Sequence, residues 1–471
     1  MQKYILFGTG TYYKNNIDRV KSKVDIVALL DNSKKKEGVY IDGIKVYMPC
    51  SICEFMYDKI LLLATDILAR EMYNQLITLG VKNDKIQFLD EFIGAYYSDV
   101  CNVYHGKKEK FQEKKKIGII STKLNYNGGT IAACNLARVL ADEGISVSII
   151  VPDVNEKLVD EITRYSIDVI VCPAINCLTY KTIESIIKFD IIIVNTFQMI
   201  DAVVKISSKK KILWWIHEPS DDYCSIYANV FSRYPGYRSL NFNNVKIYAV
   251  SSIAKGNFKK YFPNVECAIL PCTLPDYKLD TETITLKEKK IIFALIANFS
   301  QLKAQKEFAI AASEVEKKYS DSAEFWLIGN VGETNYSKEI ISITQKVPSI
   351  KILGSMTQDE IKQIYKKINV VVCPSYEETL SIVTVEGMMN SKVCIASNRT
   401  GIAQYITDKK SGLICNPGDV ISLSSCMEWC IENRESLEEI GQDGRKVYDD
   451  NFTQEKMKDR LNSIIKEFMK S

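Results

Sequence analysis

Residues 374–389 read Pro-Ser-Tyr-Glu-Glu-Thr-Leu-Ser-Ile-Val-Thr-Val-Glu-Gly-Met-Met, and this stretch decides the fold. It contains two carboxylates, Glu378 and Glu386, that lie eight positions apart. The apolar segment Asn369–Cys373 directly before it is typical of a buried parallel strand. The residues between the two carboxylates predict a change from loop to helix. Since ligands of open α/β sheets bind at the carboxyl ends of the strands, we expect a binding site here.

The groups around this predicted helix start favour one kind of ligand. Free backbone amides at a helix start can hold a diphosphate. Glu378 precedes the start and Glu386 lies a turn inside the helix, so each can accept hydrogen bonds from ligand hydroxyl groups. A sugar nucleotide carries a sugar, a diphosphate and a ribose in that order, which fits the pattern. The alternative interpretation is a helix with two solvated carboxylates.

The same stretch resembles the E-x7-E signature of retaining glycosyltransferases of family 4, which have the GT-B fold. A Cys-Pro-Ser run precedes the first carboxylate, and a Glu-Gly-Met-Met run closes the motif. The resemblance covers residues 114–471 and is closest over 291–420. It implies that Glu378 contacts the hydroxyl groups of the donor sugar and that Glu386 contacts the ribose. Further donor contacts are expected at the helix start, from Thr379, Leu380, Ser381 and Ile382.

The composition excludes several classes of protein. A chain of 471 residues is too long for one core, so about two to four domains are expected. Its 61 basic and 58 acidic residues give a net charge of +3, which does not favour a nucleic-acid binder. No apolar run reaches the length of a membrane-spanning helix. The first residues lead into a strand rather than a signal peptide, so we predict a cytoplasmic protein.

The cysteines do not form a recognisable metal site. The chain has 14 of them, scattered and mostly within apolar patterns, which is typical of free thiols in a reducing compartment. Cys50 and Cys53 form a C-x-x-C pair, but no second pair lies at zinc-site spacing and the chain has only two histidines. No Asp-x-Asp motif follows a predicted strand. The sequence therefore predicts neither a bound metal nor a cofactor.

Residues 1–95 alternate strand-like and helical patterns, which predicts a separate Rossmann-like domain. The turn Gly8-Thr9-Gly10 and Asp31 form a partial dinucleotide fingerprint, but Tyr13 replaces the third glycine. An oxidoreductase is therefore one alternative function. The run from Asp31 to Val46 resembles the nucleotide-sugar-binding domain of bacterial sugar O-acyltransferases. A docking or scaffolding module is the other interpretation. Strands are expected at Tyr4–Phe7, Asp25–Leu30 and Lys59–Leu63, with a helix at Ala69–Leu79.

Residues 96–115 are polar and are interpreted as a linker to the catalytic domains. A lysine cluster there lies beside Tyr104 and Phe111 and could contact anionic lipid, which allows peripheral association with the inner face of the cell membrane. A solvated lysine run is the alternative. The cluster consists of Lys107, Lys108, Lys110, Lys114, Lys115 and Lys116.

Two further α/β units follow, and they match the two halves of a GT-B enzyme. Residues 116–285 are expected to form the acceptor domain, and residues 286–455 the domain that binds the donor. The charged amphipathic segment 456–471 predicts a helix that, by the resemblance, packs back on the acceptor domain. Expected strands are Ile117–Ser121, Ser146–Val151, Ile167–Val171, Ile191–Val194, Lys211–Ile216, Lys246–Val250, Ile291–Ile296, Phe325–Ile328, Lys351–Leu353, Val370–Cys373 and Val393–Ala396.

His217 is the first candidate of the acceptor domain. It follows Trp214-Trp215-Ile216 and stands in a His-Glu-Pro run that resembles family-4 enzymes with lipid-linked acceptors. The resemblance places it near the diphosphate and the sugar of the donor; a packed core histidine is the alternative. The Trp pair is expected in the core. The pair Gly128-Gly129, between a strand and a helix, suits close approach of a diphosphate to the backbone.

Three loops of the last domain complete the predicted donor site. Lys303 retains the family's cation for the diphosphate, whereas Asn298 stands where the family has an arginine and Ala304 replaces a glycine. The missing cation could weaken stabilisation of the leaving group by about 1–3 kcal/mol, unless another loop supplies a basic residue. The resemblance places the nucleotide base against Gly354, Ser355 and Met356.

We therefore expect a metal-independent GT-B glycosyltransferase with an added N-terminal α/β domain. The resemblance implies a UDP- or GDP-sugar as the donor, and a bacterial surface glycan or its lipid-linked precursor as the acceptor. Glu378, Lys303 and His217 are the predicted catalytic residues. The resemblance implies retention through front-face substitution, with electrostatic support of the departing diphosphate as the main effect. Two alternatives remain open: a non-catalytic sugar-nucleotide-binding subunit, and a nucleotide-sugar epimerase of the same fold.

Overall fold

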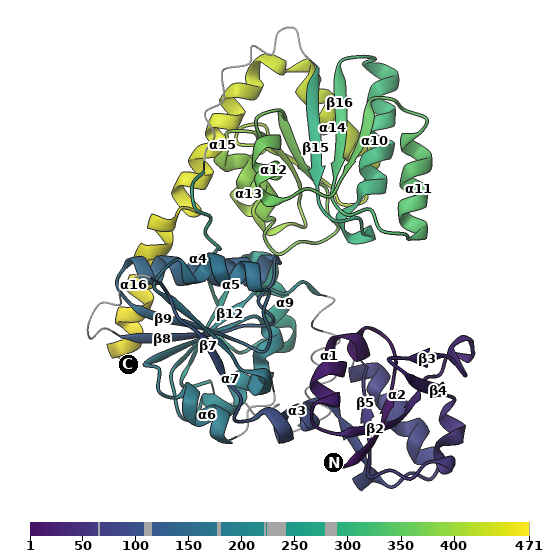
Figure 1. Cartoon of the computed structure of the whole chain (residues 1–471). Coiled ribbons are helices and arrows are strands. Elements are labelled where there is room, and N and C mark those ends of the chain that lie inside the picture. Colours follow the sequence, from purple (N-terminus) through teal and green to yellow (C-terminus); the bar gives the residue numbers. More distant parts are fainter. Residues whose placement is uncertain are drawn as a thin grey trace.

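The computed structural model describes residues 1–64, 66–107, 115–176, 180–220, 223, 242–277 and 290–470. These residues form three α/β domains, each with its own sheet and flanking helices (Figure 1). Nearly all paired strands are parallel, and their apolar side chains are buried, as expected for strands covered on both faces. This confirms the predicted α/β class.

The N-terminal domain contains strands β1 (Lys3–Phe7), β2 (Asp25–Leu30), β3 (Tyr40–Ile41), β4 (Ile44–Tyr47), β5 (Lys59–Leu62) and β6 (Ile86–Phe88), and helices α1 (Thr11–Lys21), α2 (Asp66–Thr78) and α3 (Leu89–Tyr97). The sheet order is β3-β4-β2-β1-β5-β6. The β3–β4 pair is an antiparallel hairpin that the sequence analysis did not predict. Its turn residues Asp42 and Gly43 both have positive φ, as a two-residue hairpin turn requires.

The second domain contains strands β7 (Asn102–Tyr104), β8 (Lys116–Ile120), β9 (Ser146–Val151), β10 (Ile167–Val171), β11 (Ile191–Asn195), β12 (Ile212–Ile216), β13 (Val245–Ala249) and β14 (Ala268–Ile269). Its helices are α4 (Gly128–Asp142), α5 (Glu156–Thr163), α6 (Tyr180–Ile186), α7 (Ile200–Ile206) and α9 (Ser252–Tyr261). The sheet order is β14-β13-β12-β11-β8-β9-β10-β7.

The third domain contains strands β15 (Ile291–Ile296), β16 (Ala323–Ile328), β17 (Ile350–Gly354), β18 (Val370–Cys373), β19 (Val393–Ser397) and β20 (Leu413–Cys415). Its helices are α10 (Gln305–Lys318), α11 (Asn335–Thr344), α12 (Gln358–Ile364), α13 (Ile382–Met389), α14 (Val420–Glu432) and α15 (Leu437–Asn451). The sheet order is β17-β16-β15-β18-β19-β20.

The last helix, α16 (Gln454–Lys470), leaves the third domain and packs on the second, as predicted (Figure 1). Its apolar residues Met457, Leu461 and Phe468 lie in the same buried cluster as the apolar face of α4. Lys211 Nζ donates to the Phe468 carbonyl at 2.8 Å. The helix therefore ties the third domain to the second.

The predicted linker 96–115 is only partly a linker. Its first residues belong to α3, and β7 pairs antiparallel with β10 as the edge strand of the second sheet. Because β7 is three residues long and all three residues are exposed, it carries no alternation of buried and exposed side chains that would have predicted it. Of the lysine cluster, Lys108, Lys110 and Lys114 lie outside the described residues, as does Phe111.

The N-terminal domain packs directly on the second domain. Helix α3 contacts the short 3-10 helix η4 (Pro173–Asn176), whose Ala174 is buried in the core of the N-terminal domain. Arg19 of α1 lies 3.6 Å from the Asp153 carboxylate. The N-terminal domain thus contacts the second domain through α1 and α3.

Candidate active site

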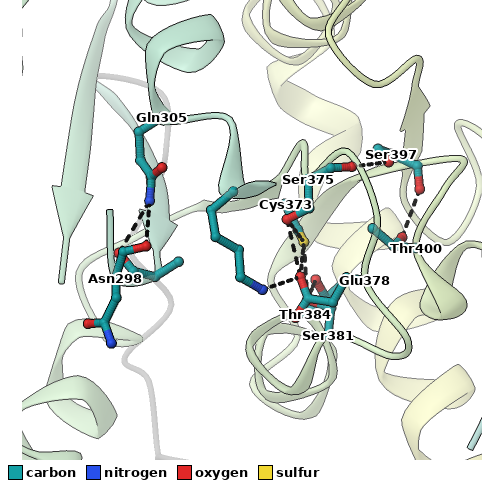
Figure 2. A network of polar contacts seen from close by, with 11 residues as sticks. Asn298, Gln305, Cys373, Ser375, Glu378, Ser381, Thr384, Ser397 and Thr400 are labelled. Carbon is teal, nitrogen blue, oxygen red and sulfur yellow. Dashed lines mark hydrogen bonds and ion pairs between the residues drawn. The ribbon is translucent and has the colours of Figure 1, made fainter. Parts of the chain in front are cut away.

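The site is centred on an ion pair between two predicted catalytic residues, Lys303 and Glu378. Lys303 ends the short 3-10 helix η8 (Gln301–Lys303) after β15, and Glu378 follows β18, the neighbour of β15 in the sheet. Lys303 Nζ lies 2.9 Å from Glu378 Oε2. Ser375 Oγ and Cys373 Sγ donate to the same oxygen at 3.2 and 3.3 Å (Figure 2). The fold therefore brings both residues to the carboxyl edge of the sheet, as predicted.

Lys303 keeps its charge in this environment. Burial alone would lower the pKa of the ammonium, but the negative charge of Glu378 outweighs burial and raises it. A charged lysine paired with a carboxylate can exchange that partner for an oxygen of an anionic ligand such as a phosphate.

The start of α13 provides backbone donors next to this pair. No side chain caps the helix, so its first amides are not occupied by Ser381. Ser381 has a φ of +80° and is held there by its hydroxyl, which donates to Cys373 Sγ and accepts from the Thr384 hydroxyl (Figure 2). A non-glycine residue in this region is strained, and such strain is concentrated at functional sites. Thr379 and Ile382 are half-buried, whereas Leu380 is a core residue at 4% exposure.

Glu386 lies one turn inside α13 and is only partly exposed. The Tyr365 hydroxyl donates to its Oε2 at 2.9 Å. Burial raises the pKa of this carboxyl, although the hydroxyls of Tyr277 and Tyr365 act in the opposite direction. Tyr277 belongs to the segment that joins the two catalytic domains, so Glu386 lies near their junction. Its predicted contact with a ribose stays a prediction.

His217 is the candidate residue of the second domain. It directly follows β12, and its ring packs against the Trp215 ring at 4.4 Å between centroids. Burial lowers its pKa to about 3, so the imidazole is neutral at physiological pH. Its Nε2 is buried and has no hydrogen-bond partner among the described residues. Trp214 and Trp215 are fully buried, as expected for core residues.

The glycine pair of the second domain is held by a residue that the sequence analysis missed. Gly128 and Gly129 begin α4, and Asn127 caps the helix by accepting from the Thr130 amide at 2.8 Å. Asn195, buried at the end of β11, donates to the Gly129 carbonyl at 3.1 Å and to Ser121 Oγ. A buried Asn at the end of an apolar strand is the signal that could have identified it.

Glu218 is a second missed residue, although it stands in the His-Glu-Pro run. It is 4% exposed, and its carboxylate accepts from the backbone amides of Phe197 at 2.6 Å and His217 at 3.0 Å. Burial raises its pKa, although these amides act against the rise. Glu218 therefore joins the ends of β11 and β12 and fixes the backbone that carries His217.

Glu377 links the two catalytic domains. Its carboxylate accepts from the Ser220 amide at 2.6 Å, the Ser220 hydroxyl at 3.1 Å and Asn257 Nδ2 at 2.9 Å, all in the second domain. Arg399 of the third domain donates to it at 3.1 Å. Burial alone would raise the pKa of this carboxyl, but these donors outweigh burial and lower it. The sequence analysis selected Glu378 and overlooked its neighbour.

A second contact between the same domains involves Gly401. A Cβ built on Gly401 would lie 2.5 Å from Ser251 Oγ, at the start of α9. Ser252 N donates to Gln404 Oε1 at 3.3 Å. The Gly401 amide in turn donates to the Glu378 carbonyl at 2.8 Å. The loop after β19 thus connects the backbone of Glu378 to the second domain.

The departures from the family pattern have local explanations. Asn298 is exposed, and its Oδ1 accepts from the Asn330 amide at 3.1 Å, so it stabilises a loop without adding charge. Its carbonyl accepts from Gln305 (Figure 2). Ala304 has a φ of +58°, a left-handed conformation in which the family's glycine would be unstrained.

The predicted base-binding loop follows β17. Gly354 has a φ of +74°, and its carbonyl accepts from the Gly329 amide at 2.9 Å. Ser355 is exposed and Met356 packs partly against the core. The loop lies at the same carboxyl edge of the sheet as Lys303 and Glu378, which agrees with its predicted place but does not test its role.

No group of three or more potential metal ligands occurs in the part of the chain that the structure describes. Among the same residues, no helix combines the length and the apolar composition needed to cross a bilayer.

Three family models match separate parts of the chain. Residues 113–236 match the model described as Glycosyl-transferase family 4, and residues 277–447 match Glycosyl transferases group 1. These matches support the family-4 resemblance of the two catalytic domains. Residues 1–87 match a model described as C2185-like, N-terminal. The expected similarity of this domain to sugar O-acyltransferases is therefore not confirmed.

Two curated relatives match the chain over short segments. One is the sulfoquinovosyl transferase SQD2 of Arabidopsis thaliana, 29% identical over 136 residues, which are 28% of this chain and 26% of that protein. The other is the capsular polysaccharide biosynthesis glycosyltransferase CapM of Staphylococcus aureus, 27% identical over 106 residues, which are 22% of this chain and 28% of that protein. The chain thus spans less than a third of the length of either relative.

A solved structure extends the comparison to the whole catalytic part. The crystal structure of Anabaena Alr3699/HepE in complex with UDP and glucose has a TM-score of 0.62 at 14% identity, over 75% of this chain and 100% of that chain. This likeness shows the fold: the second and third domains form a GT-B pair, as predicted.

Proposed function

We propose that this chain is a retaining glycosyltransferase of family 4 that transfers a sugar from a nucleotide-diphosphate sugar to a glycan. One observation carries the proposal: Lys303 and Glu378 pair at 2.9 Å beside the uncapped start of α13. The arrangement offers a cation and backbone amides for a diphosphate, and a carboxylate for sugar hydroxyls. The family matches of both catalytic domains support it.

In the proposed mechanism, Lys303 and the first amides of α13 stabilise charge on the departing diphosphate. This electrostatic support is the main catalytic effect, and it needs no metal ion. A phosphate oxygen of the donor takes the proton of the acceptor hydroxyl on the same face of the sugar, which retains the anomeric configuration. Neutral His217 orients the reacting sugar, and Glu378 holds its hydroxyl groups.

For the donor we propose a UDP- or GDP-sugar. Support for UDP comes from the HepE structure, which holds UDP and glucose. In this proposal Glu386 contacts the ribose, and Gly354, Ser355 and Met356 lie against the base. Gly128 and Gly129 approach the diphosphate from the second domain. The exposed Asn298 lies beside the donor without adding a charge.

For the acceptor we propose a bacterial surface glycan, such as capsule, O-antigen or wall polysaccharide, on a lipid carrier. The name of CapM, which concerns capsular polysaccharide, supports this class. A lipid carrier would place the enzyme at the inner face of the cell membrane as a peripheral protein. For the N-terminal domain, binding of a nucleotide sugar at the Gly8 turn stays a prediction.

The test is NMR of a nucleotide sugar incubated with the purified protein, without an acceptor. We expect slow release of free sugar, first in the anomeric configuration of the donor, by the wild type. Glu378→Ala should still bind nucleotide and release nothing. Absence of turnover by the wild type with every donor and acceptor would favour a non-catalytic binding subunit. Conversion of the bound sugar into its epimer would favour an epimerase.

A further inference from the structure

The third domain contains a cavity of about 720 Å³ that the proposed donor site does not use. Its volume lies within the range of small-ligand pockets. It opens at the carboxyl edge of the sheet, between the first turns of α10 and α11. The lining includes Lys306, Glu307, Asn335, Tyr336, Glu339 and Tyr376.

The polar groups of the cavity favour a ligand with hydroxyl groups. The Tyr376 hydroxyl donates to Glu307 Oε1 at 2.9 Å, but Glu307 Oε2 is buried and accepts no hydrogen bond from the described residues. Because Oε2 is closed off from solvent, the polar groups that a ligand hydroxyl can reach are the exposed amide of Asn335 and the exposed carboxylate of Glu339. Two tyrosine rings supply the apolar surface on which the C–H groups of a pyranose can pack.

The charges of the cavity exclude a phosphate. Glu307 and Glu339 face a single ammonium, that of Lys306, which is already paired with Glu339 at 2.7 Å. An anionic ligand would meet this excess of negative charge. The cavity therefore suits a neutral saccharide rather than a second nucleotide.

The cavity is connected to the proposed donor site through two short segments of chain. Tyr376 stands two residues before Glu378, and its amide donates to the Leu302 carbonyl at 2.9 Å, next to Lys303. The Tyr376 ring is held in place by Gly418, where a Cβ would approach it to 2.7 Å.

We propose that this cavity binds neutral sugar units of the acceptor glycan, an assignment that rests on the proposed glycosyltransferase function. Saccharide binding itself does not depend on that function and can be measured without a donor. If transfer fails but neutral saccharides bind at Tyr336, the cavity assignment survives while the activity does not. If transfer occurs but no neutral saccharide binds at Tyr336, the glycosyltransferase activity is supported and the assignment of the cavity is wrong.

The experiment is saturation-transfer NMR of the full chain with maltotriose, cellotriose and chitotriose at millimolar concentration, and with trigalacturonate as the anionic counterpart. We expect at least one neutral trisaccharide to bind, and Tyr336→Ala to weaken it at least about tenfold. Tyr336→Phe, which retains the ring, should change binding less than about threefold. The donor-site variant Lys303→Met should leave it unchanged, and trigalacturonate should bind more weakly than the neutral sugars.

A second variant covers the case in which Tyr336→Ala does not fold. Asn335 is exposed on the first turn of α11, so Asn335→Trp can block the cavity without disturbing the core. It should abolish the saccharide signal. The proposal is overturned if no neutral trisaccharide binds the wild type, if binding is unaffected by Tyr336→Ala and Asn335→Trp, or if trigalacturonate binds as well as the neutral sugars.

Discussion

The carboxylate of Glu377 accepts a hydrogen bond from the Ser220 amide at 2.6 Å and thereby joins the two catalytic domains. Its neighbour Glu378 faces Lys303 instead. Two consecutive carboxylates thus serve different contacts, one between domains and one within the proposed donor site. The contact between the domains and the Lys303–Glu378 ion pair are therefore only one peptide unit apart.

Replacing Glu377 by Ala should loosen this contact. A hydrogen bond to a charged group contributes about 1.5–3 kcal/mol, and several are lost together. We expect faster amide hydrogen exchange in α9, which carries Asn257, and a lower kcat. The exposed Glu438→Gln on α15 is the matched control. Unchanged exchange in α9 would show that Glu377 does not hold the domains.

The same contact should weaken in acid. The pKa of Glu377 is lower in the folded protein than the ordinary 4.5, so its contribution is complete above that value and is lost as the pH falls through the folded pKa. The stability difference between wild type and Glu377→Gln should shrink below about pH 4.5. Denaturation followed across this range measures it, and a constant difference would contradict the assignment.

His217 should make the folded protein less stable as the pH falls below 6.5, because the buried imidazole resists protonation. Its pKa is about 3 in the folded protein against the ordinary 6.5, so the unfolded chain binds the proton first. Each pH unit below 6.5 should cost about 1.4 kcal/mol of stability until the folded value is reached. His217→Gln should lose this dependence. The pH profile of activity should therefore contain no step near pH 6.5 that is due to His217. A step near pH 6.5 that is present in the wild type and absent in His217→Gln would contradict this assignment.

Ala304 offers a stabilising substitution. A left-handed conformation costs a non-glycine residue about 1–2 kcal/mol, while glycine loses about 0.5–1 kcal/mol of chain entropy. Ala304→Gly should therefore raise the free energy of unfolding by up to about 1 kcal/mol, with activity retained. Thermal denaturation measures it. A lower unfolding temperature would show that the φ of +58° carries no strain.

Asn195→Ala should disturb the backbone at Gly128 and Gly129, because Asn195 donates to the Gly129 carbonyl. The change removes the Nδ2 donor from the Gly129 carbonyl and from Ser121 Oγ, at a cost of about 0.5–1.5 kcal/mol for each hydrogen bond. Because this backbone is proposed to contact the diphosphate, KM for the donor should rise more than kcat falls. An equal effect on both parameters would indicate a purely structural role.

Much of this arrangement could be predicted from residue patterns, because parallel strands buried on both faces give continuous apolar runs, as at β11 and β18. The E-x7-E stretch also pointed to the carboxyl edge of the sheet at which Glu378 meets Lys303. Short exposed strands such as β7 could not be predicted, since no burial pattern marks them. Glu377 and Asn195 were missed for another reason: their partners lie far away in the sequence, and only the fold brings them together.

The most direct test of the central claim is calorimetric titration of UDP, GDP and the matching sugar nucleotides into wild type, Lys303→Met and Glu378→Gln. We predict that one nucleotide family binds the wild type and that Lys303→Met weakens it about 10- to 100-fold, the effect of a lost charged hydrogen bond. Glu378→Gln should weaken the sugar nucleotide but not the free nucleotide. An affinity that is the same in Lys303→Met as in the wild type would contradict the account, and so would the absence of binding of all of these ligands.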